Sequence, residues 1–77
     1  MAIDVQLLGY LSKYSPTGKE TFKMEVNPEG TVGWLLDELK IPPEVEKMVL
    51  VNGKQANSST KLEDGDDVFI FAPAAGG

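Results

Sequence analysis

The chain has 77 residues, with 12 Asp and Glu, 7 Lys, no Arg, His or Cys, and a formal net charge of -5. A chain of this length forms one domain whose interior is too small for a deep catalytic cleft. Without His or Cys it lacks the side chains that usually serve as nucleophile, general base, zinc ligand or disulfide. Its acidity argues against nucleic acid, and the lack of a signal peptide or long apolar run argues against a membrane, so we expect a cytoplasmic protein.

Alternating apolar residues predict two strands at the start of the chain. Residues 3–11 alternate with period two, and residues 21–26 repeat the pattern with Phe22, Met24 and Val26 on one side. The segment 15–18 between them is a turn cluster of Ser, Pro, Thr and Gly. We therefore expect a hairpin with a loose loop, ended by the turn at residues 27–30.

One amphipathic helix is predicted next. Thr31 is a suitable N-cap, because its hydroxyl can accept a hydrogen bond from an unpaired backbone amide. Apolar residues then follow at helical spacing, and Pro42-Pro43 should stop the helix near Lys40. Trp34 lies off this stripe and is expected at the helix margin rather than in a ligand site. The stripe consists of Val32, Leu35, Leu36 and Leu39.

The rest of the chain reads as three short strands. Residues 48–51 are a continuous apolar run, and Asn52-Gly53 is a strong signal for a tight turn into a return strand at 54–56. A polar loop and the acidic turn at residues 63–66 precede a last strand at 67–72. The acidic residues Glu63, Asp64, Asp66 and Asp67 are interpreted as a solvated turn, and their spacing is not that of a calcium loop.

This order predicts an α+β fold, with a single mixed sheet of four to five strands and one main helix packed on one face. If the first and last strands pair in parallel at the sheet centre, four apolar residues adjoin on the other face, where no second helix exists to cover them. An uncovered apolar patch on a small domain usually marks a partner-binding site. The four residues are Leu8, Tyr10, Phe69 and Phe71.

The sequence finishes with Pro73-Ala74-Ala75-Gly76-Gly77. Gly76 and Gly77 have no side chains, so they can enter a channel too narrow for any Cβ. Pro73 stiffens the start of this tail, and Ala74 and Ala75 keep it narrow because their side chains are small. Fully extended, the residues from Ala72 to Gly77 reach at most about 20 Å. The alternative interpretation is a frayed chain end without a function.

Several segments follow, in order, the pattern of a known family. They are Thr31-Val32-Gly33-Trp34-Leu35-Leu36, Ile41-Pro42-Pro43-Glu44, Val49-Leu50-Val51-Asn52-Gly53-Lys54, and Leu62-Glu63-Asp64-Gly65-Asp66-Asp67-Val68-Phe69-Ile70-Phe71-Ala72-Pro73 before Ala74-Ala75-Gly76-Gly77. In these segments the chain resembles the ubiquitin-like β-grasp sulfur-carrier proteins, which include the small subunit of molybdopterin synthase and the thiazole-synthesis sulfur carrier. The acidic turn, apolar strand, proline and terminal glycines in this order are the most specific part.

The resemblance implies a β-grasp domain over residues 1–72 and a flexible C-terminal tail over residues 73–77. It implies a carrier rather than an enzyme, without a catalytic residue, metal site or bound cofactor of its own. A separate ubiquitin-activating-type enzyme would use ATP to adenylate the carboxylate of Gly77, which would become a thiocarboxylate. The sulfur would pass to a synthase subunit, and the tail sequence favours the large subunit of molybdopterin synthase. Phe71 matches a position that contacts partners in that family.

Other functions remain open from the sequence. The loop at residues 14–18 differs from the usual molybdopterin subunit, which leaves room for a family member in another pathway, such as tungsten-cofactor synthesis or protein conjugation. A thiamin-type sulfur carrier is a further alternative. The same tail suits a ubiquitin-like protein modifier that ends as an isopeptide on a target lysine. A third hypothesis is a pure interaction module that uses only the apolar patch. The acidic turn is also suited to docking on a basic partner surface.

Overall fold

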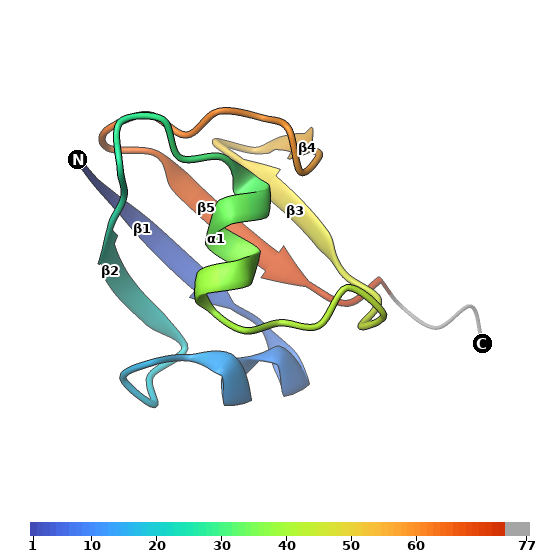
Figure 1. Cartoon of the computed structure of the whole chain (residues 1–77). Helices are drawn as coiled ribbons and strands as arrows, with labels where there is room; N and C mark the ends of the chain where they lie inside the picture. Colours follow the sequence, from blue (N-terminus) through green and yellow to red (C-terminus); the bar gives the residue numbers. More distant parts are fainter. Residues whose placement is uncertain (74–77) are drawn as a thin grey trace.

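The computed structural model describes residues 1–73, and these form one sheet with a helix across one face (Figure 1). The element types and their order agree with the predicted sequence of strands and helix, apart from an additional 3-10 helix. In chain order the elements are β1 (Ala2–Leu7), the 3-10 helix η1 (Gly9–Tyr14), β2 (Thr21–Glu25), α1 (Val32–Glu38), β3 (Met48–Val51), β4 (Lys54–Ala56) and β5 (Asp67–Phe71).

The sheet is mixed and has the strand order β2-β1-β5-β3-β4. The central pair, β1 and β5, is parallel, with Val5 opposite Val68 and Leu7 opposite Ile70. Every other neighbouring pair is antiparallel. The prediction that the first and last strands meet in parallel at the centre is therefore confirmed.

Helix α1 covers one face of this sheet and encloses the core. Its N-cap is the predicted one, because Thr31 Oγ1 accepts a hydrogen bond from the Trp34 amide at 3.2 Å. The inward residues of the central strands, such as Val5 and Ile70, are fully buried against the helix. Trp34 is half-buried at the margin of the core, as predicted. The other core members are Ile3, Leu7, Leu11, Phe22, Val26, Val32, Leu35, Leu39, Ile41, Val49, Leu62 and Val68.

The prediction of a strand through residue 11 is wrong, because β1 ends at Leu7. Gly9 has a φ of +62°, a left-handed conformation that breaks the strand and starts η1. Leu11 is still buried, but it reaches the core from η1 instead of from the sheet. The Leu8 amide adds one last hydrogen bond to the Ile70 carbonyl at 3.0 Å before the chain turns away.

Other boundaries differ from the prediction by one or two residues. Helix α1 ends at Glu38, and Lys40 adopts a φ of +59°, so the chain leaves the helix before it reaches Pro42-Pro43. β5 ends at Phe71 rather than Ala72. The Asn52-Gly53 turn is confirmed, since φ values of +53° and +83° are those of the tight turn that joins twisted antiparallel strands.

The acidic turn is more than the solvated loop that we predicted. Asp66 is only 7% exposed. Its two carboxylate oxygens accept hydrogen bonds from Asn52 Nδ2 and from the Glu63 amide, each at 2.8 Å. Asp64 Oδ1 accepts another from the Ala2 amide at 2.8 Å. This turn therefore fastens the start of β5 to the β3–β4 turn and to the start of β1.

Candidate functional site

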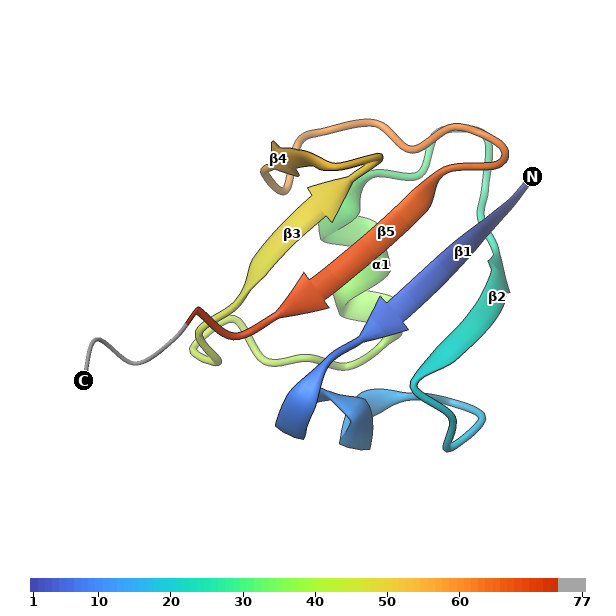
Figure 2. The ribbon, with the colours of Figure 1, turned by 180° about the vertical axis from the view of Figure 1, so that it is seen from behind.

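The face of the sheet opposite α1 is open. Seen from behind, β1, β5 and β3 lie side by side, and within residues 1–73 no helix crosses them (Figure 2). Because side chains alternate along a strand, Val68 and Ile70 point to the helix while Phe69 and Phe71 point to this open face. Phe69 remains 40% exposed. The predicted orientation of both phenylalanines is confirmed.

A groove lies on the open side where β5 ends, and we call it the tail-root groove. Phe71 is the last residue of β5, Leu8 directly follows the neighbouring strand β1, and Tyr10, from η1, is 57% exposed. Tyr10 therefore joins Leu8 and Phe71 as predicted, but from a 3-10 helix and not from a strand. The complete lining is Leu8, Gly9, Tyr10, Glu46, Phe71, Ala72 and Pro73.

Phe69 lies in a separate shallow hollow, which it shares with Leu50, Asn52, Gly53 and Asp67. The predicted single patch is thus divided between two hollows on the same side of the sheet. The sequence analysis missed Leu50 and Met48, which lie opposite Phe69 and Phe71 in the β3–β5 register. The alternation within the run 48–51 assigns these two residues to the open face only when β3 is known to lie next to β5.

Apart from Ala2, the remaining outward side chains of β1 and β2 are polar. Lys23 Nζ contacts Asp4 Oδ1 at 2.9 Å, with side chains that are 77% and 43% exposed. The hydrogen bond and charge of Asp4 raise the pKa of Lys23 above its usual value of 10.5. An exposed pair of this kind contributes little stability. The open face is therefore divided into an apolar half on β5 and β3 and a charged half on β2 and β1.

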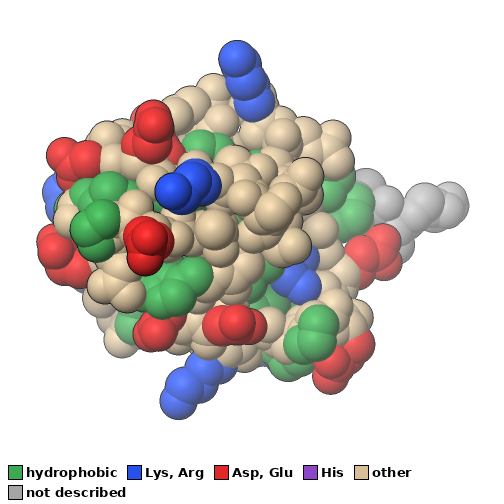
Figure 3. Space-filling model, turned by 45° about the horizontal axis from the view of Figure 1, so that its top comes forward, with side chains coloured by type: hydrophobic (Ala, Val, Ile, Leu, Met, Phe, Trp, Pro, Cys, Tyr) green, Lys and Arg blue, Asp and Glu red, His purple; other side chains and the backbone are tan. Residues whose placement is uncertain are grey.

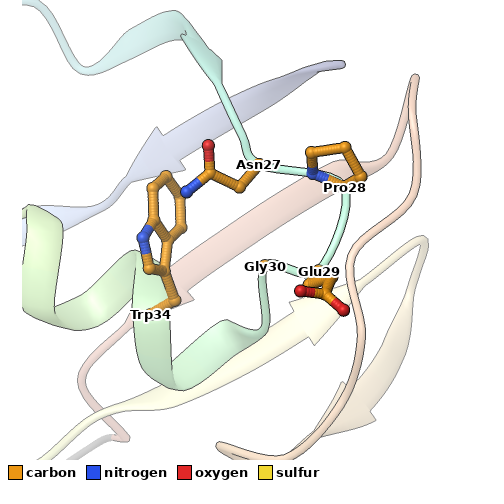
Figure 4. Close-up of a pocket in the computed structure, with 5 residues that line it drawn as sticks. All are labelled: Asn27, Pro28, Glu29, Gly30 and Trp34. Atoms are coloured by element: carbon orange, nitrogen blue, oxygen red, sulfur yellow. The ribbon is translucent and has the colours of Figure 1, made fainter.

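Another hollow lies on the helix side, around Trp34 (Figure 4). It is lined by Asn27, Pro28, Glu29, Gly30 and Trp34, and the Asn27 side chain lies beside the indole ring. A Cβ on Gly30 would come within 2.5 Å of Val26 Cγ1 and 3.5 Å of Trp34 Cε3. Gly30 is therefore needed for close packing between the turn and the helix, which is a structural reason for this segment.

The described residues offer little for chemistry by side chains. Within residues 1–73, no cluster of three or more His, Cys, Asp or Glu could hold a metal ion. In the same part of the chain, no helix is long and apolar enough to cross a bilayer. Charges of both signs are dispersed over the face seen in Figure 3, with hydrophobic side chains between them. The predicted tail residues Ala74, Ala75, Gly76 and Gly77 lie outside the described residues.

Relatives of known sequence support the resemblance. Residues 5–77 match the sequence model of the ThiS family. Small archaeal modifier protein 3 of Haloferax volcanii is 36% identical over 58 residues, which cover 70% of this chain and 61% of that protein. The match therefore spans less than two thirds of that relative's length.

Solved structures agree with the fold. The crystal structure of small archaeal modifier protein 1 from Haloferax volcanii is 24% identical, covers 100% of both chains and superposes with a TM-score of 0.80. A chain in the complex of subunits 1 and 2 of the molybdopterin-converting factor from Helicobacter pylori is 23% identical, again over 100% of both chains, with a TM-score of 0.67. With its mixed five-stranded sheet and single α-helix, the chain has the β-grasp fold and belongs to the ThiS family.

Proposed function

We propose that this protein is a sulfur carrier whose reactive group is the carboxylate of Gly77. The observation that carries the proposal is the course of β5. This strand runs along the open face and leads through Phe71 and Ala72 to Pro73 at the tail-root groove. A partner that binds the open face would therefore hold the domain beside Pro73, the residue that precedes the last four in the sequence. The family match, which continues through residue 77, also supports this proposal.

The chemistry takes place in a partner's active site. A carboxylate oxygen of Gly77 attacks the α-phosphorus of ATP, pyrophosphate leaves, and an acyl adenylate forms. Hydrosulfide then adds to the acyl carbon, AMP leaves with the bonding electron pair, and Gly77 bears a thiocarboxylate. In this proposal the chain is a protein co-substrate of a ubiquitin-activating-type enzyme, which binds ATP and catalyses these steps. Because adenylation consumes ATP, the proposal also assigns the chain to the cytoplasm.

We propose molybdopterin synthesis as the destination of the sulfur, with the chain as the small subunit of a synthase. Two observations support this choice. The tail sequence Phe71-Ala72-Pro73-Ala74 resembles the molybdopterin type, and one structural neighbour is named as part of a molybdopterin-converting factor. The large synthase subunit would then dock on the same open face after the activating enzyme has left.

The proposal is tested by intact mass. The chain ending at Gly77 is incubated with ATP, sulfide and the adenylating enzymes of its source organism, and it should gain the mass of one oxygen replaced by sulfur. Two control variants end differently: one lacks Gly77, and the other has an alanine added after Gly77. Both should remain unmodified, because the carboxylate is displaced by one residue. An unchanged mass of the parent chain, where a carrier of known activity reacts, refutes the proposal.

A second candidate function is protein modification. It is favoured by the 36% identity to a protein named as a small archaeal modifier. In that case the deprotonated amine of a target lysine, and not hydrosulfide, attacks the acyl carbon of the Gly77 adenylate, AMP leaves with the bonding electron pair, the nitrogen loses a proton, and an isopeptide bond remains. An epitope-tagged chain should then give higher-mass adducts in extracts of its source organism, and these should disappear in the variant without Gly77. Adducts without a thiocarboxylate would favour the modifier. A thiocarboxylate without adducts would favour the carrier.

A further inference from the structure

The tail-root groove is apolar except at one point. Leu8, Tyr10, Phe71 and Pro73 supply its apolar surface, and Glu46 is the only charged residue in its lining. Glu46 comes from the segment between α1 and β3 and is exposed. The groove therefore combines aromatic and aliphatic surface with one carboxylate at the root of the tail.

No cation within the described chain neutralises this carboxylate. The neighbouring Lys47 turns back into its own segment, where its Nζ donates to the Val45 carbonyl at 2.9 Å and the Pro42 carbonyl at 3.3 Å. Within residues 1–73, the single salt bridge joins Lys23 to Asp4 on the other half of the sheet. The carboxylate of Glu46 is thus available to a cation that a partner brings.

We propose that the tail-root groove binds a Lys or Arg side chain of the adenylating enzyme, and that Glu46 selects for it. The long stem of such a side chain can lie along Tyr10 and Phe71 while its charged head reaches Glu46. The Tyr10 ring adds a favourable cation–π interaction. A basic docking surface also suits a chain with a net charge of -5, since opposite charges accelerate association. This inference rests on the proposed function, because it assumes an enzyme that holds the domain beside its tail.

The test measures binding without chemistry. Calorimetric titration of the chain into the adenylating enzyme, without ATP, is repeated for Glu46→Gln and Glu46→Lys. Loss of an exposed ion pair should weaken binding by about two- to fivefold in Glu46→Gln. Juxtaposed like charges should weaken it by about tenfold or more in Glu46→Lys. The matched control is Glu44→Lys, which reverses an exposed carboxylate in the same segment but outside the groove lining, and its affinity should change less than twofold.

The outcomes separate this inference from the proposed function. If Glu46→Lys binds as well as Glu44→Lys, or if the parent chain binds no adenylating enzyme of its organism, the inference is overturned. If binding depends on Glu46 but the mass of the chain never changes, the groove inference stands and sulfur carriage fails. If the thiocarboxylate forms and the affinity does not depend on Glu46, sulfur carriage stands and the inference fails. Unchanged melting temperatures of the exposed variants confirm that each is folded.

Discussion

Replacement of Phe69 by alanine tests whether the open face is a docking surface. Phe69 lies at the middle of β5, between Gln6 of β1 and Leu50 of β3, and is 40% exposed. A phenylalanine side chain has about 200 Å² to bury, so a partner that covers the exposed share removes about 80 Å² from water. At about 25 cal/mol per Å², this contact contributes about 2 kcal/mol to binding. The expected loss of affinity is therefore about 30-fold.

The same replacement should leave the domain folded. The share of Phe69 that is already buried rests on its neighbours in the open face and not on the core under α1. Its loss lowers the free energy of unfolding by at most about 3 kcal/mol, which most domains tolerate. Circular dichroism should therefore show native secondary structure, and urea unfolding should show a lower midpoint with an unchanged slope.

The assay is calorimetric titration of Phe69→Ala into the adenylating enzyme, with Lys23→Ala as the matched control. Lys23 lies on the same side of the sheet, but on the charged β2–β1 half, so its loss should change affinity less than threefold. A folded Phe69→Ala that binds as tightly as the parent chain refutes the argument from the open face. Unfolding of Phe69→Ala would instead show that the open face is part of the structural core.

Three further predictions concern stability. Asp66→Ala removes the carboxylate that accepts hydrogen bonds from the side-chain amide of Asn52 and the backbone amide of Glu63, and it should lower the free energy of unfolding by about 3 kcal/mol in urea titration. The control Asp64→Ala, at an exposed residue, should lower it by about 1 kcal/mol. Equal losses would contradict the role given to Asp66. Gly30→Ala forces a Cβ against Val26 and should cost about 1–3 kcal/mol, and a neutral effect would show that the turn can move aside. Asp4 raises the folded-state pKa of Lys23, so the charged lysine should make the parent chain slightly more heat-stable than Lys23→Gln. This difference should have its full size below pH 10.5 and disappear as the pH rises through the folded-state pKa. A difference that persists at higher pH would contradict this assignment.

Local patterns predicted most of the fold. The β3–β4 hairpin was found with its boundaries because Asn52-Gly53 determines its turn, and the helix start was found because Thr31 provides its cap. The prediction of a strand over residues 9–11 is wrong, because Gly9 and Leu11 continue a strand pattern in the sequence while the positive φ of Gly9 ends the strand. Gly9 was the available signal against a strand, because glycine is depleted in strand interiors.

The candidate site was predictable only in part. The outward orientation of Phe69 and Phe71 follows from alternation alone, so it required no knowledge of neighbours. Leu50 and Glu46 could not be assigned in this way, because their positions depend on which strand lies next to β5 and how the segment before β3 folds back. The burial of Asp66 likewise depends on Asn52, a residue that is distant in sequence and close only in the folded chain.

The position of β5 also determines how the domain bears mechanical load. β5 is held on both sides, by β1 from Asp67 to Ile70 and by β3 from Val68 to Phe71. A force applied at Pro73 pulls this strand along its own axis, so the backbone hydrogen bonds of both ladders are loaded together in shear and do not open one by one. Forced unfolding is governed by the unfolding rate, and we expect this rate to be low where many hydrogen bonds must break together. If the residues after Pro73 were pulled through a narrow pore, the domain would therefore stay folded until the hydrogen bonds of both ladders break.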